Sequence, residues 1–184
     1  KGGHNAEHHN HNDVGSFVVA LGRGTPLVDP GAEVYTARTF SGRRYESKLL
    51  NSFGHPVPRI AGQLQQTGRK AAAGVLRTEW TDAADTLVLD LRSAYAVKGL
   101  ERLQRTFRFS RQDRGSLEVL DEVQLAQPAT FETALITFGK WKQATANKRT
   151  IGDRDGSVEV DIDTGGAAFT IGAEEIQEDR GGPP

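Results

Sequence analysis

Ser-Leu-Glu-Val-Leu-Asp-Glu-Val-Gln-Leu, residues 116–125, is the stretch that decides the fold. Apolar and polar side chains nearly alternate along it, as they do in a strand with one buried face. Similar short runs rich in Val, Leu, Phe and Thr lie on both sides of it, and helical periodicity is weak throughout. The pattern predicts an all-β protein, an antiparallel β-sandwich of the super-sandwich type.

The remaining strands are predicted by working outward from this stretch. The turn Gly-Arg-Gly-Thr at 22–25 predicts a hairpin between residues 15–21 and 26–29, and Asp155-Gly156 predicts another between 148–152 and 157–162. Further strands are expected at residues 72–80, 86–91, 105–111, 130–138 and 167–171. At most one short helix is expected, at residues 97–104. We expect one sandwich domain over residues 1–178 and a Gly/Pro tail at 179–184.

The composition limits what the chain can do. Its 184 residues suffice for one domain with a sizeable core, and 36% hydrophobic with 26% charged residues is typical of a folded chain. A net charge of −1 provides no basic field for nucleic acid, and no apolar run is long enough for a membrane span. The absence of cysteine excludes disulfides and thiolate ligands. The absence of methionine leads us to expect a processed or excised piece of a longer protein.

The histidines are concentrated at one end of the chain. His55 stands alone, and the other four lie within the first eleven residues: His4, His8, His9 and His11. Histidine is the commonest side-chain metal ligand and the usual acid or base near neutral pH. If the segment is extended, His9, His11 and Asp13 project on one face, because strand side chains alternate. The pattern indicates a functional site rather than an affinity tag or a solvated leader.

Asp29 and His55 are candidates to complete a metal site with His11. Asp29 ends the hairpin partner of the strand that follows His11, so the hairpin returns it towards His11. His55 precedes Pro56, which favours an extended backbone. Two histidines and a carboxylate suit Zn²⁺ or, less selectively, another divalent ion. The alternatives are a turn role for Asp29 and a purely structural role for His55.

Several segments, taken in order, resemble one known family. They are His-Asn-His-Asn-Asp-Val-Gly-Ser-Phe (9–17), Leu-Val-Asp-Pro-Gly-Ala-Glu-Val-Tyr-Thr (27–36), Arg-Arg-Tyr-Glu-Ser (43–47) and Asn-Ser-Phe-Gly-His-Pro-Val-Pro (51–58), with later matches at 90–95 and 131–135. Together they resemble the C-terminal domain of heparinase II/III-like polysaccharide lyases. The resemblance implies an N-terminal α/α toroid domain before the β-sandwich, with the active site between the two.

The resemblance also implies a reaction and residue roles. The zinc ligands would be His11, Asp29 and His55, and the catalytic residues His9 and Tyr45, with Tyr35 a weaker match than Tyr45. The reaction would be β-elimination in a uronate-containing polysaccharide, in which the C5 proton is removed after the carboxylate is neutralised. His9 would donate a hydrogen bond to that carboxylate or act as the base that removes the proton. The zinc would orient the site. The other catalytic groups lie on the toroid, so this chain alone is expected to be inactive.

Other residues have two interpretations each. A substrate-binding role competes with a mobile terminus or an ordinary surface for four residues: His4, Asn5, Arg43 and Arg44. Support of the zinc ligands competes with turn capping for Asn10, Asn12 and Asp13. Sugar stacking competes with core or hairpin packing for Trp80 and Trp141. The alternative function is a non-catalytic glycan-binding or structural sandwich that keeps the zinc site. The expected partners are an acidic polysaccharide and the toroid, with no nucleic acid or membrane, and we expect a periplasmic or secreted protein.

Overall fold

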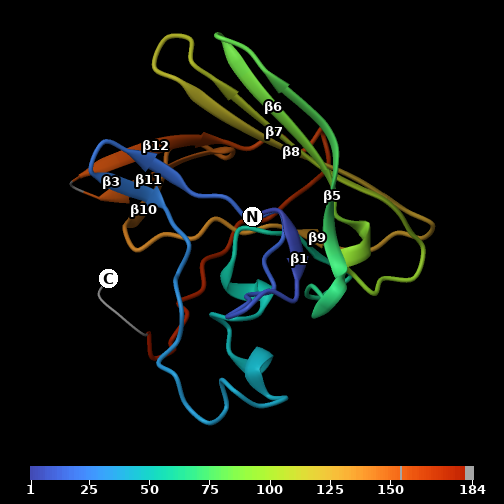
Figure 1. Cartoon of the computed structure of the whole chain (residues 1–184). Helices are drawn as coiled ribbons and strands as arrows, with labels where there is room; N and C mark the ends of the chain where they lie inside the picture. The colour runs from blue at the N-terminus through green and yellow to red at the C-terminus, as the bar shows by residue number, and fades with distance from the viewer. Residues whose placement is uncertain (154, 181–184) are drawn as a thin grey trace.

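The computed structural model describes residues 1–153 and 155–180, and it is built almost entirely of strands (Figure 1). Helical structure in this part of the chain is limited to three 3₁₀ turns: η1 (Arg44–Glu46), η2 (Ser52–Gly54) and η3 (Arg92–Ala94). Residues 181–184 of the predicted tail lie outside the described residues, whereas Arg180 bridges to Glu33. No helix among the described residues is both long and apolar enough to cross a membrane.

The larger sheet has five strands in the order β1-β5-β6-β7-β8. They are β1 (Gly3–Asn5), β5 (Gly68–Trp80), β6 (Ala84–Asp90), β7 (Leu100–Ser110) and β8 (Ser116–Leu125). Residues 116–125, which decided the predicted fold, form β8, so their prediction as a strand is confirmed. Val119 and Val123 face Phe107 and Leu103 of β7, and this is the face that packs on the core. The alternation therefore follows from one-sided burial of the sheet.

The second layer contains the three-stranded sheet β10 (Lys140–Gln143), β11 (Lys148–Asp153) and β12 (Gly156–Asp161). The hairpin of β2 (Val19–Leu21) and β3 (Gly24–Leu27) lies beside β11 and β12. A Cβ at Gly24 would come within 2.8 Å of the Asp155 backbone, so this close approach requires glycine. A short pair joins β4 (Arg59–Ile60) to β9 (Phe131–Glu132). All strand pairs are antiparallel, as predicted for the sandwich.

Several predicted elements differ from the structure. Residues 97–104 are not helical: from Leu100 onward they belong to β7, whose pairing with β6 and β8 overrides the local helical pattern. Residues 167–171 form no strand, and the strands predicted at 15–21 and 130–138 shrink to β2 and β9. A run of strand-forming residues becomes a strand only where a neighbour supplies a continuous ladder of hydrogen bonds, and in the described structure only β2 and β9 of these segments have one.

The main core lies between the larger sheet and the segments at its lower end in Figure 1. Its fully buried members come from both sides: Val14 and Ile60 from the connecting segments, and Leu89, Leu91 and Leu103 from or beside the sheet. The core thereby fixes the segments that carry the histidines onto a rigid sheet.

Arg105 of β7 is the largest fully buried side chain. Its guanidinium donates to both carboxylate oxygens of Asp121 on β8, each at 2.7 Å. It also donates to the carbonyls of Gly15 at 2.9 Å and Pro56 at 2.7 Å, and to the Thr133 hydroxyl at 3.3 Å. One buried cation therefore joins two strands of the sheet to the segments that follow His11 and His55.

Candidate metal centre

His55 is placed by a tight turn in the segment that precedes it. The Asn51 side chain accepts the Phe53 amide at 2.8 Å and caps η2. Gly54 then passes so close to the Lys48 carbonyl that a Cβ would overlap it. His55 follows with an extended backbone, as predicted from Pro56, and its side chain is completely buried.

The hydrogen bonding of the His55 ring defines which nitrogen is free. Nε2 lies 3.0 Å from the Leu49 carbonyl oxygen, which can only accept, so Nε2 carries the proton. In the neutral ring Nδ1 then presents a lone pair. Nδ1 is buried, makes no hydrogen bond to any described residue, and lies 3.2 Å from Asp29 Oδ2. A lone pair facing a carboxylate is unfavourable unless a cation or a proton lies between them.

Asp29 supplies that carboxylate from the turn after β3. Its Oδ1 accepts the Gly31 amide at 2.9 Å, which is the turn role anticipated from the sequence, while Oδ2 faces His55. The turn role and the metal-ligand role predicted for Asp29 are therefore compatible. Burial opposes ionisation of Asp29, but His55 when it also carries a proton on Nδ1, the Gly31 amide and nearby His11 lower its pKa to about 2. The carboxylate is thus ionised at any physiological pH.

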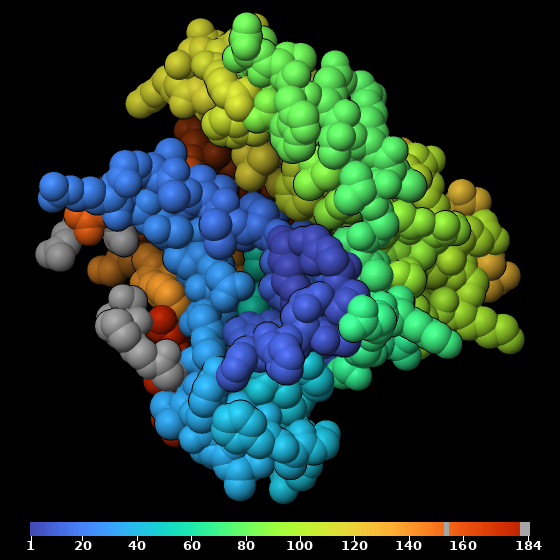
Figure 2. All heavy atoms as spheres, viewed as in Figure 1, coloured from blue at the N-terminus to red at the C-terminus, as the bar shows by residue number. Residues whose placement is uncertain are grey.

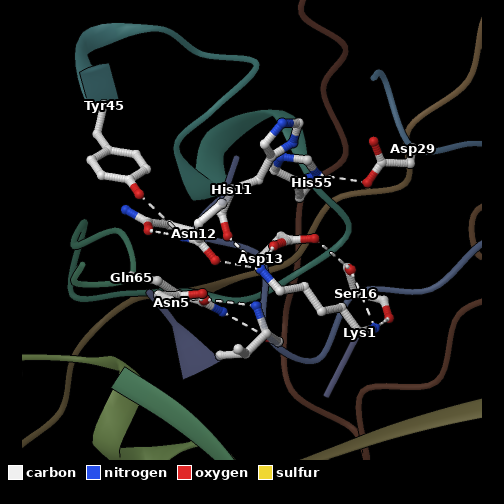
Figure 3. Close-up of polar contacts among 12 residues, drawn as sticks. Lys1, Asn5, His11, Asn12, Asp13, Ser16, Asp29, Tyr45, His55 and Gln65 are labelled. Atoms are coloured by element: carbon white, nitrogen blue, oxygen red, sulfur yellow. Dashed lines mark hydrogen bonds and ion pairs between the residues drawn. The ribbon is translucent and has the colours of Figure 1, made fainter. Parts of the chain in front are cut away.

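His11 completes the cluster (Figure 3). Its ring centroid lies 5.3 Å from that of His55, tilted by 49°, and one ligand atom from each of His11, Asp29 and His55 lies within 4.8 Å of the others. Burial, and secondarily His55, lower the pKa of His11, so the neutral, metal-binding form is favoured. The backbone N–H of Asn12 donates to the backbone carbonyl of Leu50 at 2.9 Å, which holds this segment beside the loop that leads to His55.

The donor set fits a divalent cation such as zinc. Two imidazoles and one carboxylate are common zinc ligands, and ligand atoms bound to one tetrahedral zinc lie about 3.4 Å apart. The separations here, up to 4.8 Å, would need to close by at most about 1.4 Å, within reach of side-chain rotation at the half-exposed Asp29. The unpartnered His55 nitrogen is the observation that supports the fit. These three residues could hold the metal and leave a fourth position for water or another group.

Asp13 does not share a face with His9 and His11, so this prediction is wrong. The segment is not extended, because His9 adopts a left-handed backbone with φ of 56°. Asp13 instead accepts from Lys1 Nζ at 2.5 Å and from the Ser16 hydroxyl at 3.2 Å. Lys1 Nζ also donates to the His11 carbonyl at 2.6 Å (Figure 3). Asp13 therefore supports the backbone of His11 and does not approach the ligand atoms.

Asn10 and Asn12 also stabilise the segment. The Asn10 side chain donates to the Asn12 side-chain oxygen at 3.1 Å and to the Tyr45 hydroxyl at 3.2 Å. Both asparagines are buried. The Gln65 amide adds a two-point contact with Val14, accepting its N–H at 3.0 Å and donating to its carbonyl at 2.8 Å. The polar residues around His11 thus replace the ladder that a neighbouring strand would provide.

The structure pairs His9 with Tyr35 rather than with Tyr45. The Tyr35 hydroxyl lies 3.0 Å from His9 Nδ1, and the two rings stack with centroids 5.9 Å apart. The Tyr45 hydroxyl is used by Asn10. Tyr35 is half-exposed, so the pair faces solvent. Motif similarity ranked Tyr45 first, and no spacing rule in the sequence indicated the pair with Tyr35.

The four predicted substrate-binding residues have different surroundings. Asn5 is buried, and its amide donates to the Gln65 side chain at 3.0 Å and the Gln66 carbonyl at 2.9 Å. Arg44 donates to the backbone carbonyls of Asn10 and Thr39. Arg43 is exposed and forms a two-point ion pair with Glu46, and His4 contacts Glu7 at 3.2 Å. Asn5 and Arg44 therefore have internal roles.

Trp80 and Trp141 are both exposed, at 66% and 44%, so neither is a core residue. Core packing is therefore wrong for both, whereas each lies in a strand pair, Trp80 opposite Asp85 and Trp141 opposite Ile151.

No protein-family model matches the chain, and a search of curated proteins finds no match for it.

Proposed function

We propose that this chain is the zinc-binding β-sandwich domain of a polysaccharide lyase that cleaves uronate-containing glycans by β-elimination. The supporting observation is the buried His55 Nδ1, whose lone pair faces Asp29 and His11 without a hydrogen-bond partner. The resemblance of the ordered motifs supplies the reaction class. In this proposal the protein acts in the periplasm or outside the cell, together with an α/α toroid domain.

The metal has a positioning role in this proposal. Bound zinc would hold together three segments of the chain, the ones that carry residues 11, 29 and 55. His11 and His55 lie on the segments packed against the larger sheet, whereas Asp29 follows β3 of the second layer. A metal centre there joins the two layers beside His9. Such a centre is a constraint on the fold as well as on the site.

His9 carries the chemistry that this chain can contribute. It lies two residues from His11 and faces solvent with Tyr35, which can hold one ring nitrogen while the other meets the substrate. A donor aimed at the uronate carboxylate stabilises the enolate-like charge formed when the C5 proton leaves. Protonation of the leaving glycosidic oxygen falls to groups on the toroid. Tyr35 thus replaces Tyr45 as the tyrosine of the site.

A non-catalytic role is the second candidate, and one observation favours it. Three residues predicted for catalysis or substrate binding are engaged in contacts within the domain: Asn5, Arg44 and Tyr45. A structural or glycan-binding sandwich would keep the metal cluster and need no reactive residues.

Metal content and activity test the two parts of the proposal separately. Chelator-free protein should contain one zinc per chain, and His11→Ala should lose it. The control His8→Ala changes an exposed histidine outside the cluster and should keep the zinc. Zinc-free wild-type protein would overturn the metal centre. Full-length protein with its toroid should form an unsaturated uronate product from alginate, heparan sulfate or a related polymer. Absence of product across this panel would leave only the non-catalytic role.

A further inference from the structure

The edge of β5 is only partly covered. β1 pairs with the first half of β5, at Gly68, Ala72 and Ala73. From Gly74 to Trp80 every residue is exposed, and no described strand pairs with this half on the β1 side. This end of the sheet projects beyond the rest of the chain, and the green atoms of β5 form its outer border (Figures 1 and 2).

The free segment has one of the usual protections of a sheet edge, a β-bulge between Val75 and Arg77, and lacks the others. Natural proteins block such edges with bulges, lysine, proline or very short strands. Residues 75–80, Val-Leu-Arg-Thr-Glu-Trp, contain neither lysine nor proline, and β5 is 13 residues long. Three large apolar side chains are exposed here, Val75 at 63%, Leu76 at 51% and Trp80 at 66%. The segment therefore offers unpaired backbone groups and apolar surface together.

The charges on this edge are self-complementary. Arg77 and Glu79 form an ion pair on one face of the strand, with Thr78 between them. When two copies of the segment run antiparallel around a two-fold axis at Thr78, Arg77 of each copy lies opposite Glu79 of the other. In the same register Trp80 of each copy comes opposite Leu76 of the other, the residue that β6 leaves unpaired at the bulge. Opposite charges and an apolar–aromatic contact are both favourable cross-strand pairs.

We propose that residues 76–80 pair with the same residues of a second copy of this chain. The two larger sheets then join through β5 into one continuous antiparallel sheet, and each Arg77 exchanges its partner on its own strand for Glu79 of the other copy. A two-fold axis makes the contact closed, so association ends at the dimer. The interface lies on the projecting end of the sheet and involves none of His11, Asp29 or His55, so it is independent of the proposed metal centre.

Charge exchange tests this register directly. Sedimentation equilibrium should show a monomer–dimer equilibrium for the wild type. Arg77→Glu or Glu79→Arg alone places like charges opposite each other twice, and each should weaken dimerisation by about 30-fold. The double variant R77E/E79R restores opposite charges and should recover the wild-type constant. An equimolar mixture of the two single variants should form heterodimers although each alone is monomeric.

Arg102→Glu is the matched control. Arg102 is an exposed arginine of β7 with an ion pair to Glu122, away from this edge, and its substitution should leave the dimerisation constant unchanged. A wild-type chain that stays monomeric at all concentrations overturns the proposal. So does a double variant that dimerises no better than the single ones, or a dimer that both single charge reversals leave intact.

Discussion

Replacing Arg105 by methionine should be among the most damaging single changes in this protein. The side chain is 1% exposed and makes hydrogen bonds to Asp121, Thr133 and two backbone carbonyls. Methionine fills a similar volume, but the Asp121 carboxylate, itself only 10% exposed, loses its partner. Breaking a buried ion pair from one side costs about 3–5 kcal/mol, so we expect a loss of about 4 kcal/mol in the free energy of unfolding.

The loss should be visible in urea and thermal unfolding. For a chain of this size about 4 kcal/mol corresponds to a fall of roughly 8–16 °C in Tm. The double variant Arg105→Met, Asp121→Leu removes both charges and leaves the Gly15 and Pro56 carbonyls and the Thr133 hydroxyl without the Arg105 donor. It should be about 2 kcal/mol less stable than wild type, and because Asp121→Leu alone strands the buried guanidinium and should also cost about 4 kcal/mol, the pair shows a coupling energy of several kcal/mol.

The same variant should weaken metal binding. The carbonyls of Gly15 and Pro56 belong to the segments that carry His11 and His55, so their release loosens two of the three ligands. A cost below about 1 kcal/mol for Arg105→Met, or strictly additive effects in the double variant, would refute the reasoning, because either result means that the buried contacts contribute little.

Three further predictions follow from the site and its surroundings. Gly54→Ala places a Cβ against the Lys48 carbonyl and should cost about 2 kcal/mol in urea unfolding and lower zinc affinity in a titration, whereas Gly42→Ala, which meets open space, should change neither. Burial opposes ionisation of Glu33, but hydrogen bonds from Thr39, Ser47 and Arg38 lower its pKa below 4.5, so its carboxylate stabilises the fold above that pH. Glu33→Gln should therefore be about 2 kcal/mol less stable at pH 7, and the difference should vanish as acid protonates the wild-type carboxylate; a pH-independent difference would contradict this. Because burial lowers the pKa of His11 below its ordinary value of 6.5, protonation of His11 should weaken zinc binding only below pH 6.5; if wild-type protein in competition with a coloured chelator already loses zinc at neutral pH, the reasoning is wrong.

The fold was predictable where burial is one-sided. β8 alternates because Leu117, Val119 and Leu125 are half-buried on the face that packs on the core, while Glu118 and Gln124 on the other face are exposed. The hairpin of β11 and β12 was predictable because Asp155-Gly156 is a local turn signal, although Gly156 already belongs to β12 and pairs with Asp153. Residues 97–104 were not predictable in this way, because β7 depends on partners that lie far away in the sequence.

In the candidate site, too, short-range features were predictable from the sequence and long-range contacts were not. The approach of Asp29 to His11 follows from a hairpin, which is a short-range feature, and the structure places both in one cluster with His55. The separation of His9 from Asp13 depends on a left-handed backbone at a non-glycine residue, which alternation cannot indicate. The contact between His9 and Tyr35 joins residues 26 positions apart through a loop, and no periodic pattern encodes it.

The contacts of Arg105 also have a consequence for the order of folding. Its bonds to Gly15 and Pro56 span 90 and 49 residues of chain. The segments that carry His11 and His55 are therefore synthesised well before Arg105, the side chain that fixes them. They can reach their final positions only after β7 has been synthesised and has paired with its neighbours. Closing such long loops is slow, because the entropy is lost before the contacts form. The first third of this chain should reach its final arrangement among the last steps of folding, although it is translated first.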